Sequence, residues 1–73
     1  MLMMATNKLD AIMNEEALSN AELARLSGLS ERTVGKVRRK KSNPSDNTKN
    51  KITRGLNENT KKLKTYKNGD VFP

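Results

Sequence analysis

The side chains of this sequence that could take part in chemistry are mainly cations, and they crowd together near its middle. Five cations fall within six residues, at Lys36, Arg38, Arg39, Lys40 and Lys41. Like charges so close together repel one another unless something anionic offsets them. The cluster therefore predicts an anionic partner.

The composition argues against an enzyme. The chain contains no Cys and no His, which removes thiolate nucleophiles, imidazole bases and the usual transition-metal ligands. No nucleophile and base pair, metal cluster or phosphate-binding loop can be assembled from the remaining residues. We expect no catalytic residues, no bound metal and no cofactor.

Charge and apolar residues are unevenly distributed along the 73 residues, a length that suits one small domain. Residues 1–24 hold one lysine and four acids, a net charge of −3, whereas residues 25–73 hold fourteen cations and four acids, a net charge of +10. Nucleic acid is the commonest polyanion to suit such a field, but an acidic protein or an anionic membrane surface would suit it too.

Local signals predict helices around the basic cluster. A first helix is expected from Thr6 to about Glu16, with Thr6 or Asn7 as its cap. The sequence Ser19-Asn20-Ala21-Glu22 is a capping box for a second helix over residues 20–27, which ends at Gly28 because glycine adopts left-handed conformations without steric cost. Ser30 would cap a third helix over residues 31–39.

A fourth helix is expected after the turn-rich loop at residues 41–47, with Ser45, Asp46 or Thr48 as its cap. Gly55 should weaken this helix. We expect one core, formed by the aliphatic side chains of the four helices: Leu9, Ile12, Leu18, Leu23, Ala24, Leu29, Val34, Val37, Ile52 and Leu56.

The two ends of the chain give weaker signals. Residues 1–5 are expected to be a flexible N-terminus, and residues 58–73 a flexible basic segment with a short helix near residues 60–66 or a hairpin about Asn68-Gly69. No stretch has the length of a membrane span or the pattern of a signal peptide, so we expect a cytoplasmic protein without membrane contact.

Two short helices joined by a tight glycine turn, the second basic on its outer face, form the unit with which many proteins place a helix in the major groove. The stretch AELARLSGLSERTV resembles the lambda-repressor and Cro-like helix-turn-helix family, and NPSDNTKNKITRGL is similar to the spacing around that family's fourth helix. The resemblance covers about residues 8–56. It implies an all-α, compact four- to five-helix DNA-binding domain, here over residues 6–57.

The resemblance also implies which residues contact DNA. Asn20 matches a position that meets a phosphate, whereas Glu31, Arg32 and Lys36 match positions that face base edges. Thr33 matches a position nearer the backbone, and Ser30, which caps the helix, is also expected to contact DNA. Phosphate contacts are expected from the end of the third helix, at Arg38, Arg39, Lys40 and Lys41.

Two departures from the family pattern concern the end of this helix and the start of the next. Arg39-Lys40 stands where the family often has Asn-Gly, and Lys49 where it often has an aliphatic residue. Either the third helix extends further here or the following loop is remodelled.

The function implied by the resemblance is a sequence-specific transcriptional regulator of phage or prophage type, which occupies operator DNA and requires two copies on a two-fold site. The alternative is an anti-repressor or modulator that uses the same helix-turn-helix domain to bind another repressor protein of the same genome. Binding that discriminates between DNA sequences and depends steeply on salt would distinguish the first from the second.

Overall fold

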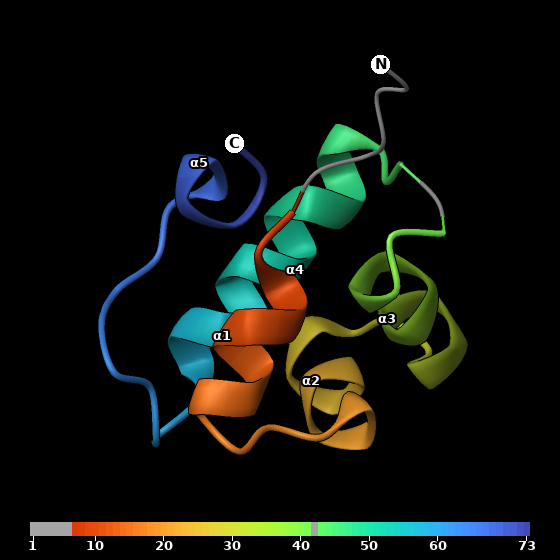
Figure 1. The fold of residues 1–73 in the computed structure, drawn as a ribbon. Helices are drawn as coiled ribbons and strands as arrows, with labels where there is room; N and C mark the ends of the chain where they lie inside the picture. Colours follow the sequence, from red (N-terminus) through yellow and green to blue (C-terminus); the bar gives the residue numbers. More distant parts are fainter. Residues whose placement is uncertain (1–6, 42) are drawn as a thin grey trace.

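In the computed structural model, which describes residues 7–41 and 43–73, every regular element is a helix. The five helices are α1 (Leu9–Glu15), α2 (Asn20–Ser27), α3 (Glu31–Arg38), α4 (Asp46–Glu58) and α5 (Asn68–Val71). Figure 1 shows α1 to α4 around a common centre, with the segment after α4 running along one side to α5. The prediction of an all-α domain of four to five helices is confirmed. Residues 1–5 and Thr6, for which a flexible end and a helix start were predicted, lie outside the described residues.

No helix in the described part of the chain is long and apolar enough to cross a membrane.

The first helix, α1, is shorter than expected, since it runs only from Leu9 to Glu15. Asn7 precedes it as a buried side chain whose Oδ1 accepts a hydrogen bond from the Leu9 backbone N–H at 3.0 Å. Its Nδ2 donates to the Val37 carbonyl at 3.0 Å, so Asn7 joins the start of α1 to α3.

The ends of α2 follow from local hydrogen bonds, as predicted. Ser19 Oγ accepts from the Glu22 backbone N–H, and the Glu22 carboxylate accepts from the Ser19 N–H, each at 3.1 Å. The bond from the Ser19 backbone N–H to the carboxylate is the largest cause that lowers the pKa of Glu22. Gly28 ends the helix in the left-handed region, with φ 77°. Ser45 is the residue that caps α4, where its Oγ accepts from the Thr48 N–H at 3.3 Å.

Twelve apolar side chains form the buried core of the described residues. Nine of the ten predicted members are buried, and the tenth, Leu29, is half-buried and packs against them. The core also includes Met13, Tyr66 and Val71, and the last two come from the segment after α4.

Gly55 has a different role from the one that the sequence suggests. A Cβ at this position would lie 3.0 Å from Ser27 Cβ, 3.1 Å from Leu23 Cδ1 and 3.1 Å from the Ser27 backbone nitrogen. The missing side chain therefore lets α2 and α4 approach closely. The loss of helix propensity at Gly55 is offset by this packing.

The expectation of a flexible basic segment at residues 58–73 is wrong. Tyr66 is 5% exposed and Val71 is fully buried, and the Lys8 backbone N–H donates to the Val71 carbonyl at 2.8 Å. No helix forms near residues 60–66, and the Asn68-Gly69 pair opens α5 instead of turning a hairpin. The Tyr66 and Val71 side chains complete the core, so the segment is held in place.

A buried carboxylate, that of Glu16, fixes this segment. It accepts hydrogen bonds from Asn59 Nδ2 at 3.2 Å, from the Leu63 backbone N–H at 3.0 Å and from the Tyr66 hydroxyl at 2.5 Å. Asn57 holds the Tyr66 backbone as well, since its Oδ1 accepts from the N–H and its Nδ2 donates to the carbonyl. Burial and the bond to the Glu16 carboxylate raise the pKa of Tyr66 above its ordinary value of 10.0.

Candidate nucleic-acid interface

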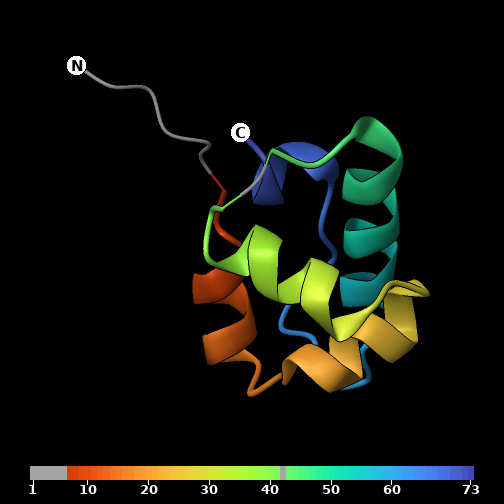
Figure 2. The ribbon, with the colours of Figure 1, turned by 90° about the vertical axis from the view of Figure 1, so that its right-hand side faces the viewer.

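The candidate interface is the outer side of α3, a helix that begins at a local cap. Ser30 Oγ accepts from the Thr33 backbone N–H at 3.1 Å and donates to Thr33 Oγ1 at 2.9 Å. Val34 and Val37 point into the core, with 0% and 1% exposure. The helical period then places the intervening polar residues on the opposite side. In Figure 2 this helix crosses the front of the molecule between α1 and α4.

The predicted base-reading residues lie together on that outer side. Glu31, Arg32 and Lys36 are all exposed, and Thr33 is half-buried beside the cap. Arg32 and Lys36 form no ion pair with an acid of the described residues. Their charge is therefore available to a partner, because nothing in the described part of the domain neutralises it.

Arg38 has a different environment from its neighbours, and the structure departs here from the expected phosphate contact. Its Nε donates to Asp10 Oδ1 at 2.5 Å, its Nη1 to Asn20 Oδ1 at 2.9 Å and its Nη2 to Asn14 Oδ1 at 2.7 Å. Only 21% of the side chain is exposed. The guanidinium charge is offset within the domain, so Arg38 supports α3 instead of extending toward a partner.

This network was not predicted from the sequence, although a signal for it exists. Asp10 and Asn14 are one helical turn apart on the polar face of α1, and Asn14 Nδ2 lies 3.5 Å from Asp10 Oδ2. Through Arg38 these two side chains connect α1 to α3, and Asn20 adds the first turn of α2. Asn20, a predicted phosphate contact, is half-buried. Its hydrogen bond to Arg38 also helps to fix the angle between α2 and α3.

The end of α3 resolves the question raised by Arg39-Lys40. The helix stops at Arg38, and Lys40 adopts a left-handed conformation with φ 60°. The Lys40 N–H donates to the Val37 carbonyl at 3.0 Å and the Lys41 N–H to the Lys36 carbonyl at 2.9 Å, which is the Schellman pattern. Lys40 therefore occupies a position that glycine would fill without strain, and the helix does not extend.

The cationic surface continues through that turn. Arg39, Lys40 and Lys41 are exposed, and none of them is paired with an acid of the described ranges. Lys49, the other departure from the family pattern, lies on α4, where its Nζ is 5.7 Å from the centre of the Phe72 ring. The outer side of α3 and the turn after it thus form one basic surface, made of Arg32, Lys36, Arg39, Lys40 and Lys41.

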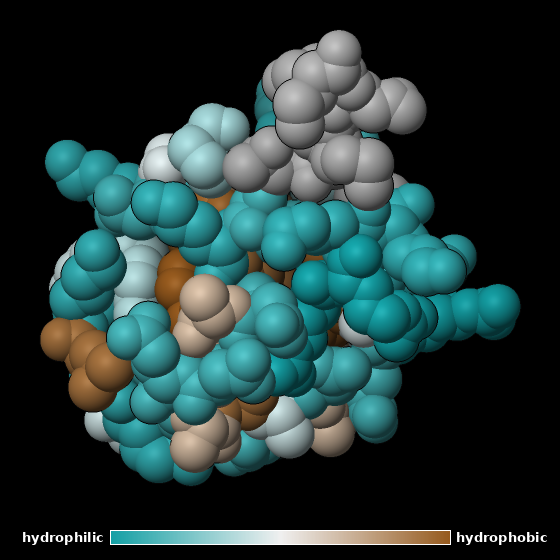
Figure 3. Space-filling view, in the orientation of Figure 1, coloured by the Kyte–Doolittle hydropathy of each residue, from teal (hydrophilic) through white to brown (hydrophobic). Residues whose placement is uncertain are grey.

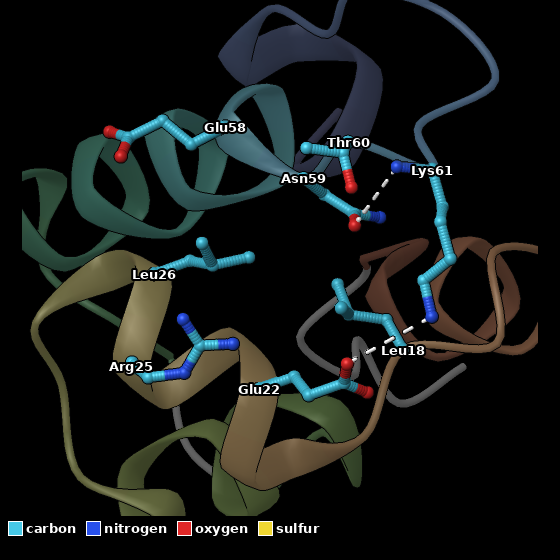
Figure 4. Close-up of a pocket in the computed structure, with 8 residues that line it drawn as sticks. All are labelled: Leu18, Glu22, Arg25, Leu26, Glu58, Asn59, Thr60 and Lys61. Atoms are coloured by element: carbon cyan, nitrogen blue, oxygen red, sulfur yellow. Dashed lines mark hydrogen bonds and ion pairs between the residues drawn. The ribbon is translucent and has the colours of Figure 1, made fainter.

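A shallow pocket of about 210 Å³ lies elsewhere, between α2 and the turn after α4. Figure 4 shows Leu18 and Leu26 beside it, with the Lys61 ammonium group directed at Glu22 across its edge at 3.9 Å. Both signs of charge line the pocket, so it lacks the one-sided field of the α3 surface. Among residues 7–41 and 43–73, no three acidic side chains are grouped so that they could hold a metal ion.

The basic surface of α3 and the turn after it could bind an extended anion. The basic surface offers donors for phosphate oxygens at the end of α3 and side chains long enough to reach base edges along the helix. We found no match to the chain among protein-family models, curated proteins or solved structures.

Proposed function

We propose that the protein is a sequence-specific DNA-binding regulator that reads operator DNA with α3 in the major groove. The observation that carries this proposal is the contrast between Arg38, whose charge is neutralised by Asp10, and the five exposed cations around it, which have no acidic partner in the described part of the domain. A protein that needed these cations only for its own stability would pair them. Unpaired cations on one exposed helix face instead suit a polyanion.

The contacts that hold α3 in the domain favour sequence-specific recognition of DNA over non-specific electrostatic binding. Base-specific contacts require a helix held at a fixed angle, and α3 is fixed by Val34 and Val37 in the core and by the Arg38 network. Arg32 and Lys36 can donate to guanine O6 and N7, and Glu31 can accept from a cytosine amine. Arg39, Lys40 and Lys41 would meet phosphates and set the register.

The charge also sets an expected salt dependence. If Arg39, Lys40 and Lys41 each neutralise one phosphate, log K for one copy should fall with log salt with a slope of about −3. One copy offers few base contacts, so we propose that two copies bind a two-fold operator with half-sites about 34–36 Å apart. Such a protein would act in the cytoplasm, where the DNA is.

The test is binding of the purified chain to duplex fragments from the intergenic DNA beside its own coding sequence, measured by fluorescence anisotropy from low to high salt. Arg32→Ala or Lys36→Ala should relax operator choice by about 1–3 kcal/mol, whereas Lys40→Ala should weaken all duplexes similarly. Lys62→Ala, on the segment after α4, is the matched control and should change neither.

Two results would contradict the proposal. One is equal binding of all duplexes, unaffected by Arg32→Ala and Lys36→Ala. The other is a stoichiometric complex with another repressor protein of the same genome in the absence of DNA preference, which is the outcome expected of an anti-repressor or modulator. Sedimentation with and without duplex would count the copies on each fragment.

A further inference from the structure

The segment that joins α4 to α5, residues 60–67 and here called the strap, carries an apolar side chain that the fold does not use. Leu63 is 67% exposed and is the large hydrophobic side chain left in solvent within the described part of the chain. Its backbone is nevertheless fixed, because the Leu63 N–H donates to Glu16 Oε2 at 3.0 Å. Burying a leucine side chain stabilises a fold, and the domain forgoes this contribution while holding the residue in place.

The surroundings of Leu63 are cationic. All of the lysines of the strap are exposed, namely Lys61, Lys62, Lys64 and Lys67. Lys61 lies 3.9 Å from Glu22, and Lys64 lies 5.5 Å from the centre of the Tyr66 ring, so both ammonium groups are held near the strap. Figure 3 shows a hydrophobic knob at the left edge of the molecule, where Figure 1 draws the strap, with hydrophilic surface around it.

The strap is far from the basic surface on α3. In Figure 1 the strap runs down the left side and α3 lies on the right, and in Figure 2 the strap passes behind the helices while α3 is in front. A partner on the strap would therefore leave α3 free. The inference that follows does not depend on what α3 binds.

A second copy of the chain fits the strap poorly. A two-fold interface brings the same patch of both copies together, and here it would oppose lysines to lysines. The acids near the strap cannot balance them. Glu16 is buried, Glu22 is paired with Lys61 and Asp70 accepts from the Lys67 backbone N–H, which leaves exposed Glu15 against the remaining lysines. Nucleic acid would satisfy the lysines but would leave Leu63 without an apolar contact.

We propose that the strap is a docking surface for an acidic protein segment, one in which Asp or Glu residues flank an aliphatic or aromatic side chain. The acidic groups would meet Lys62, Lys64 and Lys67, and the apolar side chain would cover Leu63. The Glu16 hydrogen bonds to the Leu63 N–H and the Tyr66 hydroxyl hold the surface ready, so little ordering is required on binding.

The experiment uses a displayed library of random twelve-residue peptides, selected on the immobilised full chain and then resynthesised. Selected peptides should be acidic around an apolar residue, should bind at least tenfold more weakly to Leu63→Ser and to Lys62→Glu, and should shift the amide resonances of residues 60–67 but not those of α3. Lys36→Ala is the matched control on the other surface and should bind them as the wild type does. Because Leu63 is exposed, Leu63→Ser should leave the melting temperature unchanged.

Several outcomes would overturn the proposal. They are the absence of acidic peptides among those selected, equal binding by Leu63→Ser, a dimer in sedimentation that Leu63→Ser abolishes, and phosphatidylglycerol vesicles bound through Leu63. Duplex DNA that shifts the strap resonances as strongly as those of α3 would overturn it too. Each of these is distinct from the results that test DNA binding by α3.

Discussion

Gly55→Ala distinguishes packing from helix propensity, because the two effects have opposite signs there. Alanine in the interior of a helix is favoured over glycine by about 1 kcal/mol, so α4 alone should gain stability. The new Cβ would meet Ser27 Cβ at 3.0 Å, Leu23 Cδ1 at 3.1 Å and the Ser27 backbone nitrogen at 3.1 Å. Overpacking of this kind costs about 1–3 kcal/mol, and a backbone atom cannot move aside as a flexible side chain can. We expect a net loss of up to about 2 kcal/mol.

The matched control is Gly35→Ala, the same change in the interior of α3. Its Cβ would lie 3.4 Å from Arg39 Nη1 and 3.5 Å from Asn20 Nδ2, which is ordinary contact with the ends of side chains. It should therefore gain up to about 1 kcal/mol. Thermal unfolding followed by circular dichroism would measure both, with about 4–8 °C expected per kcal/mol for a domain of this size. A Gly55→Ala variant more stable than the wild type would refute the close approach of α2 and α4.

Three further perturbations test other parts of the structure. Lys40→Gly and Ala17→Gly each replace a residue with positive φ, 60° and 53°, and each should stabilise the domain by about 1 kcal/mol in chemical denaturation. Only Lys40→Gly should also weaken DNA binding, with the salt slope reduced by about one, and equal effects of the two on DNA would contradict the assignment. A double-mutant cycle of Asp10→Ala and Arg38→Ala should give a coupling energy of at least about 0.5 kcal/mol, and additivity would show that the bridge is absent in solution. The pKa of Tyr66 is raised in the folded state, so the stability that depends on its neutral form is complete below pH 10.0 and is lost as the pH rises above it. Unfolding measured from pH 8 to 12 should show this loss in the wild type and a smaller one in Tyr66→Phe.

The parts of the fold that the sequence predicted well are those fixed by neighbouring residues. The capping box at Ser19 and Glu22, the left-handed turn at Gly28 and the cap at Ser30 all depend on groups three or four residues apart. The same holds for the core positions of α1 to α4, since the helical period alone selects the buried face. The exposed position of Arg32 and Lys36 on α3 follows from that period as well.

The segment after α4 was mispredicted because its order depends on contacts between distant residues. Glu16 and Tyr66 are 50 residues apart, and in the sequence Glu16 resembles any acid on a polar helix face. A stretch with many lysines and few aliphatics has the composition of a flexible end, and only a buried acceptor elsewhere in the chain changes that outcome. No local sequence pattern indicates that the Glu16 carboxylate is such an acceptor.

The sequence by itself thus determined α1 to α4, the caps of α2 to α4, the tight turn at Gly28 and the basic character of the face that follows it. Each of these is set by hydrogen bonds and side-chain spacing within a few residues. The tertiary structure alone decided which cations are free. Arg38 is neutralised because Asp10, 28 residues away, lies within hydrogen-bond distance once α1 and α3 pack. In the same way, Gly55 became a contact point between two helices and Leu63 an exposed side chain on a fixed strap, since burial and charge pairing depend on which surfaces meet in three dimensions.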